Sequence, residues 1–158
     1  MLCHRANLFK IVFTILLGTG IFVCLTLNTA LLVARSNSMP YRYFLLYKTT
    51  HIHKGDYVAI INHPAPGIGD KLLTKKLVGV AGDELCVHEQ TLWINEEWQG
   101  LLKKARSNGE PLTPLSISEI PEGFGFVAGE HVHSLDSRYQ EFGLVSMQNI
   151  VGKVYPLW

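Results

Sequence analysis

The sequence has little cysteine and no recognisable cysteine pattern. Its 158 residues contain three cysteines, Cys3, Cys24 and Cys86, which are far apart, and Cys24 lies inside a long apolar run. An odd number at such spacings does not favour a disulfide framework, and the absence of a C-x-x-C pair disfavours a zinc site of that type. We therefore interpret the three cysteines as unpaired.

An excess of charge of one sign is also missing. Lys and Arg number 14 against 13 Asp and Glu, which leaves a formal net charge of +1. Nucleic-acid-binding domains usually carry a clear basic footprint, so we expect no nucleic-acid partner. The length leaves room for one domain, and no internal repeat or low-complexity tract is present.

Charged residues are absent from residues 11–34, which are mostly apolar. About 20 apolar residues are needed to cross a bilayer as a helix, so this run is long enough. Arg5 and Lys10 precede the run and only Arg35 directly follows it, which by the positive-inside rule predicts a cytoplasmic N-terminus. A cleavable signal peptide is the alternative, but its apolar core is normally shorter and no clean small-x-small site precedes Arg35. The expected organisation is a cytoplasmic N-terminus (1–10), a transmembrane anchor (11–34) and an outer domain (35–158).

Beyond residue 40 the sequence shows almost no helical periodicity. Short apolar runs separated by glycine, proline and polar turns predict β-strands. The expected strands are 41–47, 57–62, 71–80, 84–88, 91–94, 123–128 and 143–145, with residues 89–90 at a hairpin tip. The polar segment 99–111 is interpreted as a short helix or a mobile insertion. The expected fold class is mainly β, with an N-terminal transmembrane helix followed by a single antiparallel β domain.

Two serines alternate directly after the apolar run. Ser36 and Ser38 would point the same way in an extended backbone. Pro40 removes a backbone donor and disfavours helix at Met39, so the segment is restricted. Such a segment can hold a nucleophilic hydroxyl at the edge of a membrane. The alternative is an ordinary surface turn without a catalytic role.

A lysine pair lies in the strand expected over residues 71–80. Strand alternation places Lys75 on one face with Leu73 and Leu77, and Lys76 on the other face. Apolar surroundings disfavour the ammonium form and lower a lysine pKa, and a neutral amine can accept a proton from a serine. Two solvated lysines on an edge strand are the alternative reading.

A third polar segment covers residues 129–139. Ser134, Asp136 and Arg138 alternate there and share one face if the backbone is extended. An Asp and an Arg two residues apart can form a charge-assisted bond, and most such pairs are structural.

These three segments together, in this order, resemble the type I signal peptidase family of Ser/Lys serine proteases. The matching boxes are residues 36–40 (SNSMP) after a membrane anchor, residues 75–83 (KKLVGVAGD) and residues 134–138 (SLDSR). The resemblance covers nearly the whole chain and implies the signal-peptidase type of β domain with no cofactor.

The resemblance also implies a role for each residue. Ser38 matches the nucleophile and Lys75 the general base. Ser36 matches the hydroxyl that helps stabilise the oxyanion, and Ser134 the residue that orients the lysine amine. Asp136 and Arg138 match a supporting ion pair.

The small size, the Ser-Met-Pro start and the sequence of residues 134–139 are similar to the conjugative-transfer, TraF-type branch. Members of that branch process pilin precursors, and some join the pilin ends into a ring.

The implied partners are a pilin or preprotein precursor with a hydrophobic signal segment and the lipid bilayer. The implied location is the bacterial inner membrane, with the catalytic domain in the periplasm. A general signal peptidase that removes secretory signal peptides is an alternative. The segment before Ser134 is shorter than the usual last box of the family.

Histidines provide rival hypotheses. His51 with His53, and His131 with His133, could each face one way on a strand and suit a metal, but no carboxylate or cysteine obviously completes either set. A Ser38–His133–Asp136 triad is also conceivable, because triads are defined by geometry and not by order. A non-enzymatic alternative is a membrane-anchored β module that scaffolds a secretion or conjugation apparatus.

Overall fold

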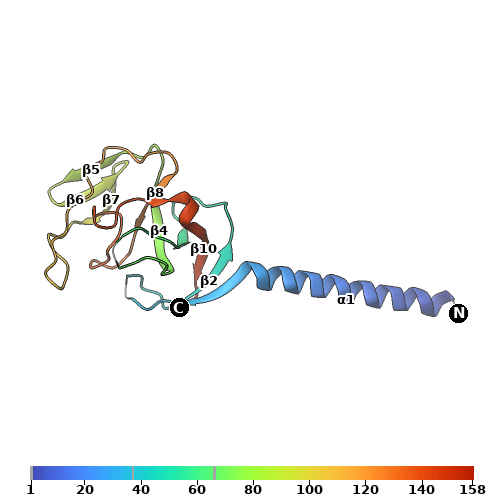
Figure 1. The fold of residues 1–158 in the computed structure, drawn as a ribbon. Helices are drawn as coiled ribbons and strands as arrows, with labels where there is room; N and C mark the ends of the chain where they lie inside the picture. Colours follow the sequence, from blue (N-terminus) through green and yellow to red (C-terminus); the bar gives the residue numbers. More distant parts are fainter. Residues whose placement is uncertain (1, 37, 66) are drawn as a thin grey trace. The chain divides into compact units, whose positions relative to one another are not determined.

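The structure is a computed structural model that describes residues 2–36, 38–65 and 67–158 (Figure 1). Within these ranges, side chains are described from residue 10 onward. The chain divides into two units, residues 1–30 and Leu31–Trp158. Each unit is described by itself.

The first unit is dominated by helix α1, Leu2–Asn28. Its segment Lys10–Asn28 has a mean hydropathy of 2.2 and is long and apolar enough to cross a membrane. Threonine hydroxyls bond back to helix carbonyls, as Thr14 does to Lys10 at 2.9 Å, so these polar groups are satisfied within the helix. The apolar run expected as one segment over 11–34 is helical only as far as Asn28. Residues Thr29–Val33 form a strand instead.

The second unit contains a seven-stranded sheet. In spatial order its strands are β1 (Thr29–Val33), β2 (Tyr43–Lys48), β10 (Ile150–Pro156), β3 (Tyr57–Ile60), β4 (Leu73–Val80), β8 (Phe124–Ala128) and β9 (Val145–Ser146). The pairs from β2 to β9 are antiparallel. A 3-10 turn, Met147–Asn149, joins β9 to β10. The mainly β, antiparallel fold expected from the sequence is confirmed.

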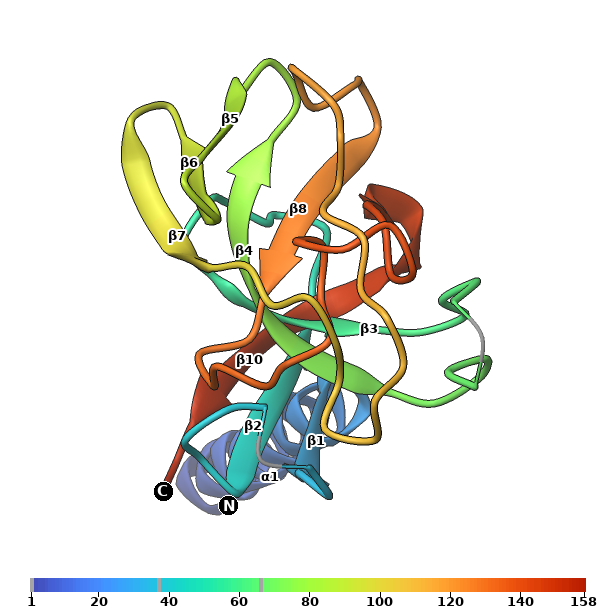
Figure 2. The same cartoon turned by 90° about the vertical axis from the view of Figure 1, so that its left-hand side faces the viewer.

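A second, three-stranded sheet is formed by β5 (Leu85–His88), β6 (Thr91–Ile94) and β7 (Glu97–Leu101) (Figure 2). Glu89 and Gln90 both have positive φ, 47° and 64°, as a two-residue hairpin turn of the primed type requires. The hairpin expected at this position is therefore present.

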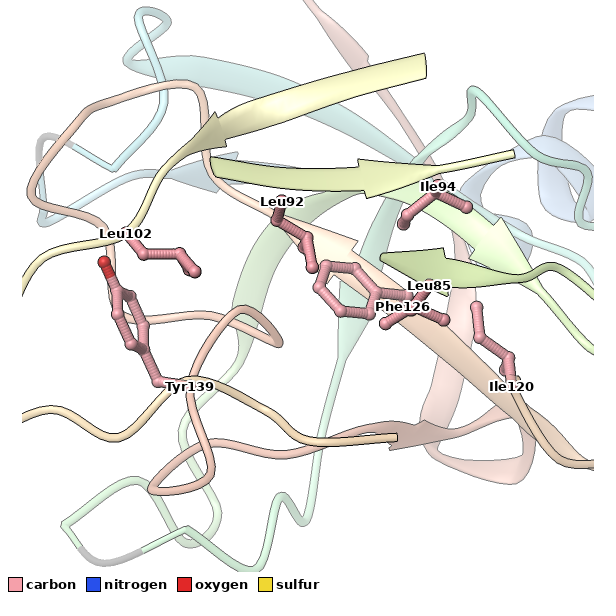
Figure 3. Close-up of a cluster of buried hydrophobic side chains, with 7 residues drawn as sticks. All are labelled: Leu85, Leu92, Ile94, Leu102, Ile120, Phe126 and Tyr139. Atoms are coloured by element: carbon pink, nitrogen blue, oxygen red, sulfur yellow. The ribbon is translucent and has the colours of Figure 1, made fainter. Parts of the chain in front are cut away.

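Two apolar clusters hold the domain together. The first lies beneath the three-stranded sheet (Figure 3), and its buried members are Leu85, Leu92, Ile94, Leu102, Ile120, Phe126 and Tyr139. The second lies against the large sheet, and its buried members are Val58, Ile60, Leu77, Val127, Phe142 and Val145. Neighbouring residues of β4 contact different clusters, because successive side chains of a strand point to opposite faces: Leu77 belongs to the second cluster and Val78 packs against the first.

The segment 99–111 does not form the expected short helix, and the alternative of a mobile insertion stays a prediction. Its start belongs to β7, and the remainder is irregular chain with a single bridge between Ala105 and Pro111. Strand β10 was also not anticipated. Its Gly152 lies so close to β2 that an added Cβ would be 2.8 Å from the Cα of Lys48. Only glycine allows this approach, and the strand pairs on both sides here.

Candidate active site

Strand β4 carries Lys75 into the interior. Lys75 pairs with Val58 of β3, and its side chain is 4% exposed. The alternation of β4 puts Lys75 on the same face as Leu77, as the sequence predicts. Lys75 is thus a buried amine at the centre of the large sheet.

The Lys75 amine donates a hydrogen bond to the Ser134 hydroxyl at 2.5 Å. Burial disfavours the ammonium form and lowers the pKa of Lys75 from 10.5 to about 8. The nearby Asp136 carboxylate acts in the opposite direction and raises this pKa, and the Arg138 guanidinium lowers it. The neutral amine is therefore accessible near physiological pH. With one N–H directed at Ser134, its lone pair remains available for another proton.

Asp136 and Arg138 form a buried ion pair behind Lys75. The Nε and Nη2 atoms of Arg138 each donate to a carboxylate oxygen of Asp136 at 2.8 Å. Asp136 also accepts from the backbone N–H of Gly129 at 2.9 Å. This bidentate arrangement, further fixed by a backbone group, holds the loop that carries Ser134.

Gly129 brings the segments of Ser38 and Ser134 together. A Cβ on Gly129 would lie 2.6 Å from the Ser134 Cβ and 2.8 Å from the Ser38 carbonyl oxygen. The same loop donates the His131 N–H to the Ser38 carbonyl at 3.1 Å. The absence of a side chain at position 129 therefore permits the close approach of two segments far apart in sequence.

Ser38 lies just before the buried side chain of Met39. The hydroxyl of Ser38 is 3.2 Å from the hydroxyl of Ser36. This contact agrees with the expectation that the two alternating serines point the same way. Met39 fixes the segment to the domain, while Ser38 stays partly exposed.

One cleft of about 890 Å³ collects these groups. Ser36, Ser38, Lys75 and Ser134 all line it. Apolar residues from the end of β1, from residues 68–73 and from Phe142 form much of its wall. Asp136 and Arg138 do not line the cleft and lie behind Ser134. A hydroxyl and a neutral amine in a partly apolar cleft are the components of Ser/Lys acyl transfer.

A family model described as "Signal peptidase, peptidase S26" matches residues 5–158. The chain belongs to the signal peptidase family S26. It is accordingly a serine peptidase of the signal peptidase type, and its apolar helix supports a membrane-anchored protein.

The chain was also compared with solved structures and with curated sequences. A crystal structure of a signal peptidase I from Enterococcus faecalis matches at 24% identity with a TM-score of 0.45, covering 66% of this chain and 97% of that one. Among curated protein sequences, none matches the chain.

The rival histidine hypotheses gain no support from the geometry of this S26 family member. His131 and His133 do line the cleft. However, the His133 ring is hydrogen-bonded to the Lys103 amine at 2.7 Å, and the Asp136 carboxylate is bonded to Arg138 and to the backbone N–H of Gly129. Within residues 2–36, 38–65 and 67–158, no group of three potential metal ligands was found.

Sequence reasoning missed two contributors to the site. Gly129 was seen only as the start of a polar segment, and its close approach to Ser38 could not be read from its neighbours. Tyr57 donates a hydrogen bond to Glu130, which ties the loop of Ser134 to β3. A tyrosine at the start of an expected strand gave no signal of this role.

Proposed function

We propose that Ser38 is the nucleophile and Lys75 the general base of a membrane-anchored endopeptidase. The observation that carries the proposal is the buried Lys75 amine, with its lowered pKa, in the cleft that Ser38 also lines. A lysine that can be neutral near pH 8 is suited to remove a proton from a hydroxyl.

The reaction then follows from this arrangement. The Ser38 Oγ attacks the scissile carbonyl carbon while its proton moves to the Lys75 amine. The tetrahedral intermediate collapses as Lys75 returns that proton to the leaving amine, which leaves an acyl-enzyme. Water then attacks the ester carbonyl as Lys75 takes one of its protons, and Lys75 passes that proton to the Ser38 Oγ as the ester bond breaks, which restores the hydroxyl and the neutral amine.

The neighbouring groups have supporting roles in this proposal. The Ser134 hydroxyl orients the Lys75 amine through their 2.5 Å hydrogen bond. The Ser36 hydroxyl and the Ser38 backbone N–H stabilise the oxyanion, a type of contact typically worth about 3–4 kcal/mol per donor. Asp136 and Arg138 position Ser134 and balance the charge felt by Lys75.

For substrate, we propose precursors that keep a hydrophobic segment in the bilayer, above all pilin precursors of conjugation. The domain is placed in the periplasm, because the basic residues Arg5 and Lys10 precede the apolar segment. The apolar wall of the cleft fits the small apolar side chains typical of such cleavage sites.

The test is cleavage of a precursor by purified full-length variants. Ser38→Ala and Lys75→Ala should abolish cleavage, and Lys75→Arg should do the same because a guanidinium does not release its proton. Lys76→Ala is the matched control and should keep its activity, since this adjacent lysine lies on the other face of β4. His133→Ala should also keep much of the activity. Cleavage by Lys75→Ala together with its loss in His133→Ala would reverse the assignment of the base.

The substrate is tested separately by co-expression with either a pilin precursor or a secretory preprotein. Mass spectrometry should show a shortened pilin that depends on Ser38, and a further loss of one water would reveal ring closure. Cleavage of the preprotein alone would instead identify a general signal peptidase. Precursor processing or conjugation that continues with Ser38→Ala would support the scaffold alternative.

A further inference from the structure

A second pocket lies against the face of β4 that is turned away from the Lys75 side chain. Its volume is about 420 Å³, and it is lined by Lys76 and Val78 of β4. Strand alternation puts these two residues on the face opposite Lys75 and Leu77. Residues of β7 and of the loop after β8 complete the pocket, where β7 ends beside β4 (Figure 2).

The floor of this pocket includes the guanidinium of Arg138, which is 4% exposed. Two of its nitrogens, Nε and Nη2, are used by Asp136. For the third, Nη1, the described residues provide no hydrogen-bond acceptor. A Cβ on Gly100, another lining residue, would be 2.9 Å from Nη1, which places this nitrogen at the pocket wall. Nη1 is not a fully buried atom, so it can be reached from the pocket, and a ligand that supplies an anionic acceptor there gains a charge-assisted hydrogen bond.

The walls are apolar and the remaining charge is mostly positive. Trp98, Leu101 and Val132 are exposed apolar side chains that line the pocket. Lys76 adds a second cation, with its amine 5.7 Å from the Tyr57 ring centroid. The carboxylate among the described lining residues belongs to Glu130, and it accepts a hydrogen bond from Tyr57.

We propose that this pocket binds a small molecule in which one carboxylate is joined to an apolar, preferably aromatic, group. The carboxylate accepts a hydrogen bond from Nη1 of Arg138 within the field of Lys76. The apolar part packs on Trp98 and Leu101. The volume lies in the range of small-molecule sites, about 300–1,000 Å³.

Binding there has a consequence for the active site, and this part rests on the proposed function. The charged groups that act on Lys75 are Asp136 and Arg138, and the cleft on its other side is lined by Arg35, Lys71, His131 and His133. The positive charge of Arg138 lowers the pKa of Lys75. An anion bound beside Arg138 offsets that charge and should therefore raise the pKa of Lys75. Less neutral amine would then be present at pH 7, and cleavage should slow.

Binding is tested with 4-phenylbutyrate titrated into the full-length protein in zwitterionic detergent, followed by calorimetry or NMR. The uncharged 4-phenylbutanol and the cationic 4-phenylbutylamine serve as matched probes. The acid should bind at least about tenfold more tightly than either, because only the acid can accept from Arg138. Equal binding of the three probes, or none, would overturn the proposal.

Two surface variants locate the site without disturbing Arg138. Trp98→Ala should weaken 4-phenylbutyrate binding by about threefold to tenfold through loss of aromatic contact. Val132→Glu should weaken it further by repulsion. Their controls lie outside the pocket at similar exposure: Trp158→Ala (73% exposed, against 59% for Trp98) and Val87→Glu (47%, against 44% for Val132). Equal effects of variants and controls would contradict the assignment.

Two further measurements distinguish the ligand class and the consequence. A peptide with a free C-terminal phenylalanine should bind less tightly than 4-phenylbutyrate, and binding of the peptide alone would exclude a small-molecule site. Cleavage rate should be measured as a function of pH with and without saturating 4-phenylbutyrate. In the wild type the ligand should shift the rise of the rate to higher pH, and in Val132→Glu, which binds the ligand weakly, it should not. An unmoved limb despite binding would refute the coupling to Lys75, whereas loss of all cleavage in untreated enzyme would count against the proposed function instead.

Discussion

Two regions of the domain consist of side chains that are buried to a similar degree and have opposite chemistry. The cluster beneath the three-stranded sheet, around Leu92 and Phe126, is apolar except for the hydroxyl of Tyr139, which accepts a hydrogen bond from the Lys103 backbone. The region behind the cleft buries Lys75, Asp136 and Arg138, three ionisable groups. The first region stabilises the fold by removing apolar surface from water, whereas the second carries a desolvation cost that is offset only while every partner is present. The comparison indicates that stability resides in one region and reactivity in the other.

The strongest test of this contrast removes one partner of the buried ion pair. Asp136→Asn leaves the Arg138 guanidinium buried without a counter-charge, so unfolding in urea should show a loss of about 3–5 kcal/mol. The double variant Asp136→Asn/Arg138→Met should be less destabilised than the single variant. If the two variants lose the same stability, the pair does not behave as one unit.

Leu92→Ala probes the apolar region. Leu92 is fully buried, and its truncation should cost about 3 kcal/mol through lost contacts and a cavity. The kcat measured per folded molecule should be unchanged, because Leu92 lies outside the cleft. A fall in kcat at temperatures where the variant is folded would show that the regions are coupled.

The pH dependence of cleavage probes the polar region. With the pKa of Lys75 near 8, activity should increase with pH and level off above that value. At pH 6 about 1% of the amine is neutral, so the rate should be about 100-fold below the plateau. Circular dichroism at each pH provides the folding control. A flat profile would exclude Lys75 as the base.

Lys75→Met should lose activity yet gain stability. The pKa of Lys75 is lower in the folded chain, about 8, than the ordinary value of 10.5. The cost of burying the charge is therefore complete below pH 8, declines between 8 and 10.5, and is absent above that. The variant should be about 1–3 kcal/mol more stable than wild type at pH 7, with the gap closing by pH 10.5. A constant gap across this window would mean that burial of the charge is not the cause.

The smallest effect is expected on the surface of the irregular segment. Arg106 and Glu110 form a partly exposed ion pair at 2.9 Å. Glu110→Gln should change the free energy of unfolding by less than about 0.5 kcal/mol and leave cleavage unaffected. A larger effect on cleavage would give the segment a part in the active site.

The sequence predicted the elements whose signals are local. Alternating apolar residues placed Lys75 in a strand and on an apolar face, and the spacing of two apolar runs predicted the hairpin with residues 89–90 at its tip. It did not reveal β10, whose glycine-containing sequence is a strand only because partners from distant parts of the chain flank it. The apolar run also hid the end of α1, since apolar residues continue from the helix into strand β1 and their hydropathy does not mark the change.

The polar site shows the same division. Ser134, Asp136 and Arg138 lie in one short segment, so their association could be anticipated. The approach of Gly129 to Ser38 and the bond between Tyr57 and Glu130 depend on tertiary packing, which no local pattern encodes. The proposed roles of Ser38 and Lys75 came from the resemblance, and the burial of Lys75 supports the role proposed for the lysine.

The position of β10 has a consequence for biosynthesis. It follows the other described strands in the chain, yet it lies between β2, which follows the Ser38 segment, and β3, which adjoins the strand of Lys75. A ribosome must therefore produce residue 156 before the two halves of the large sheet can be joined. Until then the strand that follows Ser38 and the strand that carries Lys75 are not joined through the sheet, so the framework around the two proposed catalytic residues is completed only late in translation.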